Sequence, residues 1–281
     1  MRLAGLLCGL ALAGTLVGQD GPPVEISLKG VIDLHCHSGP DAVARVANSF
    51  EVVRQARTAG MRGVVLKNHY VSTAALAQLA MQELGGIEVF GGIVLNRAAG
   101  GINPEAVRRM IQVEGRTGRI VWLPTFDAEN QVRSAKEERP FVAVVRDGKP
   151  VPALAEVFQI AAEADLVLAT GHSSAADSII VLEAARKACV KRLLVTHALT
   201  DPTRFTIEEM KRVAALGAVI ECTWLALLSG TNRAANVTLV ADCARAIQAV
   251  GAANFAISSD LGQANNPLHT EGLRTFIAAL N

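Results

Sequence analysis

The sequence predicts an α/β protein, a (β/α)8 TIM barrel, because short apolar runs and helical patterns alternate along the chain eight times. The runs are rich in Val, Ile and Leu and are mostly apolar on both faces, as buried parallel strands are. A chain of 281 residues is long enough for one such barrel. A doubly wound open sheet shows the same alternation. However, no Gly-x-Gly-x-x-Gly follows the first run, so the sequence does not support a nucleotide-binding sheet.

The eight predicted strands are residues 31–34, 63–66, 87–95, 120–123, 166–169, 192–195, 218–220 and 254–257. Several of the predicted helices between them begin with capping signals. These signals are Asn48 with Glu51, Ser72 or Thr73, Asn103-Pro104, Ser174 with Asp177, Thr206 with Glu209, and Asn266-Pro267.

One segment departs from the alternation after the fourth predicted strand. Asp147-Gly148 lies between the apolar runs 141–145 and 149–151, which is a strong β-hairpin signal. Because loops after barrel strands carry catalytic sites, we expect a small β-hairpin insertion that forms a lid or a pocket wall. A hairpin without a functional role is the alternative.

Residues 1–20 differ in composition from the rest of the chain. Arg2 precedes an uncharged apolar run over residues 3–17, and polar residues and prolines then follow. This pattern predicts a secretory signal peptide, and a buried N-terminal helix is the alternative. We therefore expect a barrel domain over residues 24–281 in an exported protein, periplasmic or secreted, with no membrane association after cleavage.

The net charge bears on the kind of partner, and the cysteines bear on whether disulfides hold the fold. The formal net charge of +1 argues against a nucleic-acid partner, so we expect a small-molecule substrate and allow for a homo-oligomer. Cleavage of the signal peptide would leave four of the five cysteines, which we interpret as small buried hydrophobes rather than a disulfide framework. They are Cys36, Cys189, Cys222 and Cys243.

The positions of the histidines predict a metal site. Five of the six lie at or just past the carboxyl end of a predicted strand: His35, His37, His69, His172 and His197. Asp260 follows the eighth strand, whereas His269 falls in the last predicted helix and is interpreted as structural. Because these strand ends converge on one face of a barrel, we expect a divalent metal there. The donor set suits Zn²⁺ best, and also iron, manganese or cobalt.

The pattern Asp33-x-His35-x-His37, with later histidines after strands five and six and an aspartate after strand eight, resembles the amidohydrolase superfamily. Residues 90–96, 122–125 and 171–172 are similar to an uncharacterised bacterial branch of it. The resemblance implies that the metal is held by His35, His37, His172, His197 and Asp260. It also implies that Asp260 is the base toward a metal-bound water, which attacks a C–N or C–O bond of a small substrate. His197 and Lys67 are the other predicted catalytic residues, and His69 is a further candidate ligand.

The number of ions depends on where the chain departs from the superfamily pattern. Two-metal members carry a modified lysine or a glutamate at the end of strand four, and residues 122–127 contain neither. We therefore expect one ion and keep two as an alternative. Lys67 could bridge two ions if it were carboxylated. The preferred interpretation is an ordinary ammonium group that binds substrate or balances the carboxylates.

A second family shares part of the pattern and gives the alternative function. His69 and Glu221, with the opening Asp-x-His-x-His, resemble the polymerase-and-histidinol-phosphatase barrels, which implies a phosphoesterase. Those barrels follow their late Ser-Asp with x-His, whereas Ser259-Asp260 is followed by Leu261-Gly262. A mononuclear decarboxylase or lyase and a metal-bearing binding protein are further alternatives.

Substrate-binding residues are predicted from the same strand ends. Arg45, Lys67 and Arg97 indicate an anionic substrate such as a carboxylate or phosphate, unless they are solvated surface charges. Asn96, Thr125 and Glu221 are the other candidates for lining the pocket.

Overall fold

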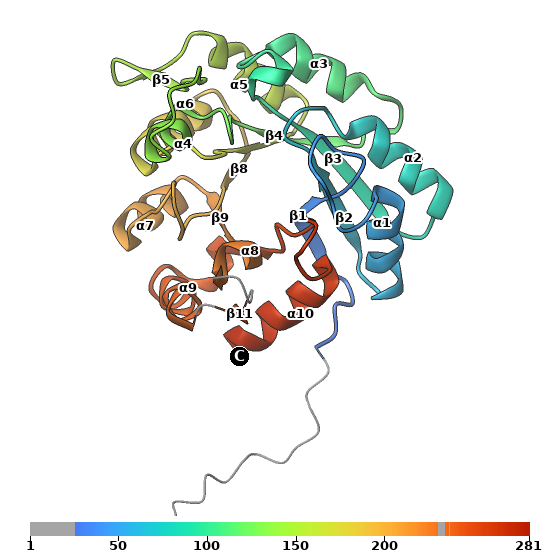
Figure 1. Ribbon diagram of the computed structural model, residues 1–281. Helices are drawn as coiled ribbons and strands as arrows, with labels where there is room; N and C mark the ends of the chain where they lie inside the picture. Colours follow the sequence, from blue (N-terminus) through green and yellow to red (C-terminus); the bar gives the residue numbers. More distant parts are fainter. Residues whose placement is uncertain (1–25, 230–233, 236) are drawn as a thin grey trace, which may run out of the picture.

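The computed structural model describes residues 26–229, 234–235 and 237–281, which form a ring of strands surrounded by helices (Figure 1). The predicted signal peptide lies outside the described residues and stays a prediction. Within the described ranges, no helix has the length and apolar character needed to span a membrane.

The eight barrel strands form one parallel sheet in the order β1-β2-β3-β4-β7-β8-β9-β12. They are β1 (Ile32–His37), β2 (Gly63–Lys67), β3 (Glu88–Val94), β4 (Gly118–Trp122), β7 (Val167–Ala169), β8 (Arg192–Val195), β9 (Ala218–Thr223) and β12 (Phe255–Ser258). The first strand meets the last beyond β12, where Asp260 N donates to His35 O and His37 N donates to Leu261 O, both at 2.7 Å. The predicted barrel is confirmed, and each predicted strand overlaps an observed one.

Eight longer α-helices lie between or after these strands in the described residues. They are α1 (Ser49–Thr58), α2 (Ala74–Leu84), α3 (Pro104–Gln112), α5 (Ala153–Glu163), α6 (Ala175–Lys187), α7 (Ile207–Ala215), α9 (Val237–Val250) and α10 (His269–Leu280). The shorter elements are α4 (Glu129–Ser134), α8 (Trp224–Leu227), η1 (Arg97–Ala99), η2 (Glu114–Arg116), η3 (Ala252–Asn254) and the strand pair β10 (Leu228–Ser229) and β11 (Ala234–Ala235).

The capping signals locate most helix starts. Asn48 opens α1 with a capping box, in which its side chain accepts from Glu51 N at 3.0 Å and its N–H donates to Glu51 Oε2 at 2.7 Å. The start predicted at Asn266-Pro267 is wrong. Asn266 closes a turn by donating its N–H to Gln263 O at 2.9 Å, so α10 begins only at His269.

The segment after β4 contains a short antiparallel pair, β5 (Val145–Arg146) and β6 (Lys149–Pro150). Asp147 and Gly148 turn the chain between them with φ values of +49° and +71°, the left-handed conformation that tight hairpin turns require. The predicted role of this segment as a lid or wall stays a prediction.

Apolar side chains fill the barrel beneath the strand-end histidines. Val65, Val94, Ile120, Trp122 and Leu194 are buried there, and the Trp122 ring lies 6.1 Å from the His35 ring. A layer of buried apolar side chains strengthens electrostatic interactions among the polar groups above it.

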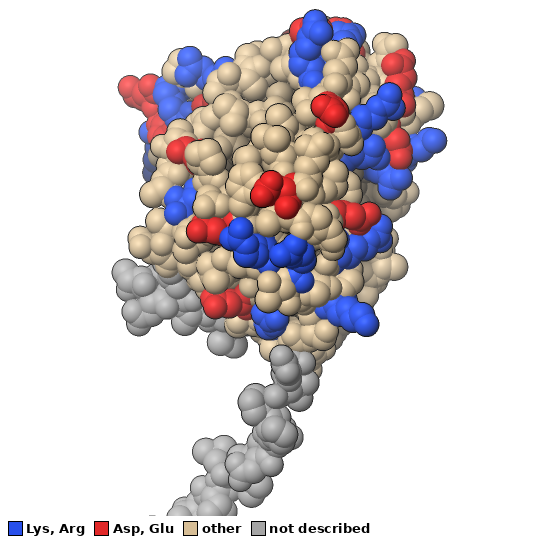
Figure 2. Space-filling view, turned by 90° about the vertical axis from the view of Figure 1, so that its right-hand side faces the viewer, with Lys and Arg blue, Asp and Glu red and all other residues tan. Residues whose placement is uncertain are grey.

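The surface charges agree with the near-neutral net charge, whereas the cysteines agree with their prediction only in part. Figure 2 shows basic and acidic side chains interspersed over the visible face, in keeping with the net charge of +1. The four described cysteines are free, and three of them are buried as predicted. Cys189 is exposed, so its interpretation as a buried hydrophobe is wrong. It follows α6 with a φ of +67°, in a turn at the surface.

Candidate metal centre

Three histidines converge on the carboxylate of Asp260. The Nε2 atoms of His35 and His37 lie 2.9 Å and 3.1 Å from Asp260 Oδ1, and Nε2 of His197 lies 3.3 Å from Oδ2. His35 and His37 share one face of β1 because they are two residues apart. The four side chains therefore come from β1, from the turn after β8 and from the turn after β12.

The residues present fit a divalent metal ion. His35, His197 and Asp260 each offer a ligand atom, and these atoms all lie within 4.8 Å of one another. Nε2 of His197 is buried without a hydrogen-bond partner, because its contact with Asp260 lacks hydrogen-bond geometry. A buried polar atom left unpaired in this way is costly, and a cation among these groups would satisfy it.

His172 lies beside this group and is anchored through one ring nitrogen. Its Nδ1 donates to Gln131 Oε1 at 2.8 Å, and its ring stands edge-on to the His197 ring with the centroids 5.1 Å apart. With the proton on Nδ1, Nε2 carries the lone pair that a metal requires.

His69 lies at the side of the cluster rather than at its centre. Its ring stacks between His37, 4.7 Å away, and Phe126, 3.9 Å away. Its Nδ1 bonds the hydroxyl of Thr125 at 2.8 Å.

Burial keeps most of these imidazoles neutral. It lowers the pKa of His37 to about 3 and that of His197 to about 4, and it holds the pKa values of His69 and His172 well below the usual range. Neutral imidazole is the form that coordinates a metal.

His35 carries the opposite shift. Burial lowers its pKa, but the carboxylates of Asp260 and Glu221 outweigh burial and raise that pKa to about 9. Burial also raises the pKa of Asp260, yet His35 and His197 outweigh it and hold that pKa well below the usual range. Without a metal, a proton on His35 therefore balances the carboxylates, and a bound cation would take the place of that proton.

Lys67 is buried against the same imidazole. Its Nζ lies 2.7 Å from His35 Nε2 and 5.1 Å from the centre of the Trp122 ring. Burial lowers the pKa of Lys67 to about 8 despite the nearby Asp260 and Glu221. Only one proton can lie on the line between these two nitrogens. Either the Lys67 ammonium donates it to His35 Nε2, or a protonated His35 donates it to a neutral Lys67 amine.

Glu221 lies behind His35, on the side away from Asp260. Its Oε1 and Oε2 accept from His35 Nδ1 at 3.2 Å and 3.3 Å, and Oε1 also accepts from Ser258 Oγ at 2.6 Å. It is fully buried. These bonds make Glu221 an orienting partner of a metal-ligand candidate rather than a group that faces substrate.

Asn96 and Thr125 support His69. Asn96 Nδ2 donates to His69 O at 3.0 Å and to Thr125 Oγ1 at 2.9 Å, and its Oδ1 accepts from Thr125 N at 2.8 Å. Both side chains are fully buried and are occupied by these bonds. These bonds give both side chains a supporting role at His69, and their predicted part in substrate binding stays a prediction.

The two predicted arginines are not brought together. Arg45 is paired with Asp41 at 2.6 Å and its side chain is only 5% exposed. Arg97 is exposed on η1, where its backbone N–H donates to Asp127 Oδ2 at 2.9 Å.

Asp33, Cys36 and His269 form another group with potential ligand atoms. Asp33 Oδ1 already accepts from His35 N at 3.2 Å and from Ser259 N at 3.0 Å, and Oδ2 lies 3.2 Å from His269 Nδ1. Burial raises the pKa of the Cys36 thiol well above its usual value, so it is not a thiolate. We interpret this group as a structural tie between β1, β12 and α10.

Two residues of the cluster have strained backbones. His197 has a φ of +52° and Asp260 a φ of +51°, a region that is costly for residues other than glycine. The bonds from Asp260 N to His35 O and from Gln263 Nε2 to Asp260 O at 2.9 Å hold one of these turns. Strain that is retained next to converging polar groups is typical of functional sites.

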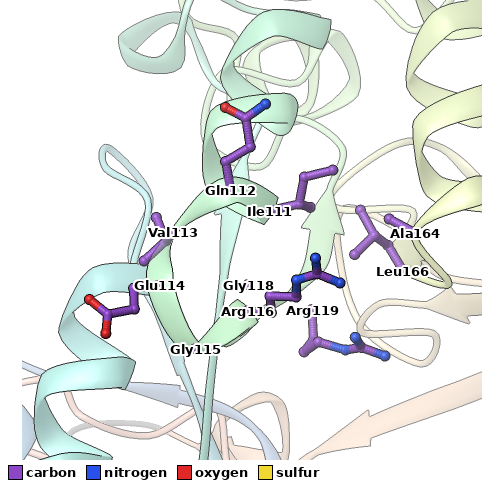
Figure 3. A pocket seen from close by; sticks show the side chains of 10 residues that line it. All are labelled: Ile111, Gln112, Val113, Glu114, Gly115, Arg116, Gly118, Arg119, Ala164 and Leu166. Atoms are coloured by element: carbon purple, nitrogen blue, oxygen red, sulfur yellow. The ribbon is translucent and has the colours of Figure 1, made fainter.

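A cavity of about 280 Å³ opens beside the histidines. It is lined by Gln131, Ser134, Ala135, His172, His197, Asp201 and Pro202. A larger cavity of about 500 Å³ lies where α3 ends and β4 begins (Figure 3). That is the amino-terminal end of the barrel, opposite the histidines, so it has no part in their chemistry.

Several solved structures share the fold of this chain. The fold is that of an amidohydrolase from Pseudomonas aeruginosa (14% identity, TM-score 0.57, covering 85% of this chain and 76% of that one). It is also that of a candidate 2-pyrone-4,6-dicarboxylic acid hydrolase from Pseudomonas putida (15% identity, TM-score 0.56, covering 90% of this chain and 91% of that one). A TatD homologue from Escherichia coli shares it as well (15% identity, TM-score 0.54, covering 89% of this chain and 88% of that one). The strand-end histidines and Asp260 thus lie in a (β/α)8 barrel whose fold is shared with these three proteins.

The family is shown by the sequence itself. Residues 30–221 match the model of DUF6282, a family of unknown function, and the chain belongs to that family. No curated protein matches the chain.

Proposed function

We propose that the protein is a metal-dependent hydrolase that uses one divalent ion, with Zn²⁺ the best fit, to cleave a C–N or C–O bond of a small substrate. The observation that carries this proposal is the approach of three histidine Nε2 atoms to within 2.9–3.3 Å of the Asp260 carboxylate. Three imidazoles and a carboxylate are the donors that zinc prefers.

The chain's own residues have separate tasks. His35, His37, His197 and Asp260 would hold the ion, and the His172 ring lies beside that of His197. When bound, such an ion supplies Lewis-acid chemistry, since it polarises the electrophile and acidifies water. Asp260 stays ionised at pH 7 because its pKa is held well below the usual range, so its carboxylate can accept a proton as the nucleophile forms.

The phosphoesterase alternative is less well supported by the geometry. It needs Glu221 and His69 at the ion, but Glu221 is bonded behind His35 and His69 is stacked between His37 and Phe126. A lyase and a binding protein share the metal site, so activity measurements must separate them from a hydrolase.

Replacement of the proposed base tests the proposal. Asp260→Asn keeps the shape of the side chain and removes its basicity. We expect hydrolysis of phenyl acetate by the zinc-loaded protein to fall about 100-fold or more, with a smaller loss of bound zinc. Asp165→Asn is the control, because Asp165 lies at the opposite end of the barrel and is paired with Arg192.

Elemental analysis of the same samples gives the second readout. One zinc equivalent per chain is expected, and a value near zero would contradict the metal site. Two equivalents would bring Lys67 or His69 into the ligand set. Faster hydrolysis of 4-nitrophenyl phosphate than of phenyl acetate would favour the phosphoesterase, and unchanged turnover in Asp260→Asn would exclude Asp260 as the base.

A further inference from the structure

Most of the exposed large apolar side chains lie at the carboxyl end of the barrel. Among the described residues, five such side chains stand out, namely Val43, Val46, Val71, Leu79 and Phe126. All but Leu79 lie on the loops that follow β1, β2 and β4, at the carboxyl end of the barrel where the histidines lie. Ligand pockets are lined mainly by apolar and aromatic side chains around a few polar groups.

Phe126 is the one of these that touches the cluster. Its ring stacks on His69 at 3.9 Å with an interplanar angle of 26°, and it faces the His172 ring edge-on at 6.1 Å. The residue is still 39% exposed. One aromatic surface thus spans two strand-end histidines and remains accessible from solvent.

The loop that carries Phe126 is held firmly. Arg139 donates to Phe126 O at 2.6 Å and to Asp127 Oδ1 at 2.7 Å. Asp127 N donates to Asn96 Oδ1 at 3.2 Å, and Asp127 Oδ2 accepts from Arg97 N at 2.9 Å. A ring presented from a fixed backbone loses little freedom when a ligand packs against it.

The charges at this end of the barrel are largely neutralised within the protein. Arg45 is bound to Asp41, Arg139 to Asp127, and Arg204 to Asp201. Lys67, which the sequence offered as a partner for an anion, is only 1% exposed and contacts His35. Arg97 is the exposed cation among those that were predicted to bind an anion.

We propose that the substrate carries a flat apolar group, an aryl or unsaturated ring, beside the bond that is cleaved, and that this ring packs against Phe126. This inference rests on the proposed metal-dependent hydrolase, because it places the scissile bond at the histidines. It replaces the expectation of an anionic substrate with one recognised by stacking.

Hydroxamates test the metal site and the aryl subsite separately. The hydroxamate group binds a metal ion, and its substituent contacts the neighbouring protein surface. Calorimetry with the zinc-loaded protein should show benzohydroxamate binding about three- to tenfold more tightly than acetohydroxamate. Phe126→Ala and Phe126→Leu should both remove that preference while leaving acetohydroxamate affinity unchanged. Leu79→Ala, which removes a 57% exposed apolar side chain on α2, is the control that keeps the preference.

The outcomes distinguish the two proposals. Equal binding of both hydroxamates, or a preference that survives Phe126→Ala and Phe126→Leu, would overturn the aryl subsite while the metal site stands. Tighter binding of a carboxylate-bearing hydroxamate than of benzohydroxamate would also overturn it. Failure of acetohydroxamate to bind would overturn the metal site, and the aryl subsite with it.

Discussion

Glu221 shows how one buried carboxylate decides the chemistry of its neighbour. It accepts from His35 Nδ1, while Ser258 Oγ donates to it, so its position and that of the imidazole ring are fixed together. The bond directs the proton to Nδ1 and leaves Nε2 as the atom that faces Asp260 and Lys67. Carboxylate partners of this kind raise the basicity of a ligating histidine.

Substitution of Glu221 should therefore weaken metal binding, although Glu221 contacts His35 and is not itself a proposed ligand. Glu221→Gln keeps the size of the side chain but removes the charge that raises the pKa of His35. We expect zinc affinity, measured by competition with a chromophoric chelator, to fall about 10- to 100-fold. Glu208→Gln on α7 is the control, since the side chain of Glu208 is 82% exposed. Equal zinc affinity in the two variants would show that Glu221 does not orient a ligand.

At the scale of residues, the sequence predicted which side chains converge but not how each one is oriented. His35, His37, His197 and Asp260 were predictable because each ends or follows an apolar strand, and parallel strand ends converge. The roles of Glu221, Asn96 and Thr125 were not predictable. They lie at the same strand ends, and only the direction of each side chain separates a group beneath the site from one that faces substrate.

The short helix α4 is the element that joins two loops of the site. Asn130 Nδ2 donates to His172 O at 3.0 Å and to Pro202 O at 2.8 Å, which ties the loop after β7 to the loop after β8. The next residue, Gln131, accepts from His172 Nδ1. α4 thus fixes both the backbone and the ring of His172.

Loss of the Gln131 acceptor should weaken metal binding through His172. In Gln131→Leu, Nδ1 of His172 has no partner, so the ring is free to turn or to change tautomer. We expect zinc affinity to fall about tenfold or more, and Gln131→Glu, which retains an acceptor, to preserve most of it. Gln159→Leu, at an exposed position on α5, is the matched control. If Gln131→Leu binds zinc like this control, His172 is not a ligand that α4 positions.

No sequence signal marked α4. The helix has six residues, too few for an apolar periodicity to show, and its N-cap is Ala128, which makes no side-chain capping bond. The longer helices were found because they combine such signals with repeats of apolar residues. Gln131 and Phe126 follow β4 on a segment where we predicted Thr125 as a pocket residue and the absence of two-metal ligands, but no role for these two side chains.

At the scale of the molecule, the barrel brings five histidines together in one buried place. This arrangement lowers the free energy of unfolding of the metal-free protein at acid pH. The unfolded chain takes up protons on histidine near pH 6.5. In the metal-free fold His37 and His197 resist protonation until about pH 3 and 4, and the pKa values of His69 and His172 are also far below 6.5. Below pH 6.5 the unfolded state therefore binds more protons than the folded state.

The free energy of unfolding should consequently fall as pH decreases from 6.5, by about 1.4 kcal/mol per pH unit for each neutral buried histidine. His35 acts in the other direction. Its folded pKa of about 9 lies above the unfolded value, so its contribution is complete below pH 6.5 and is lost as pH rises through 9. The metal-free protein should be most stable near pH 6.5, with a steeper acid limb than alkaline limb from this cluster.

Urea unfolding in EDTA at pH 5.5, 6.5 and 8 would measure both limbs. Removal of one titrating ring, as in His69→Gln, should reduce the slope of the acid limb by one proton. Glu208→Gln, which places glutamine at an exposed position outside the cluster, should leave that slope intact. Stability that rises below pH 6.5 would contradict neutral buried histidines. In that case the rings would be protonated in the folded state, and cations packed around Asp260 would have to be displaced together before any metal could bind there.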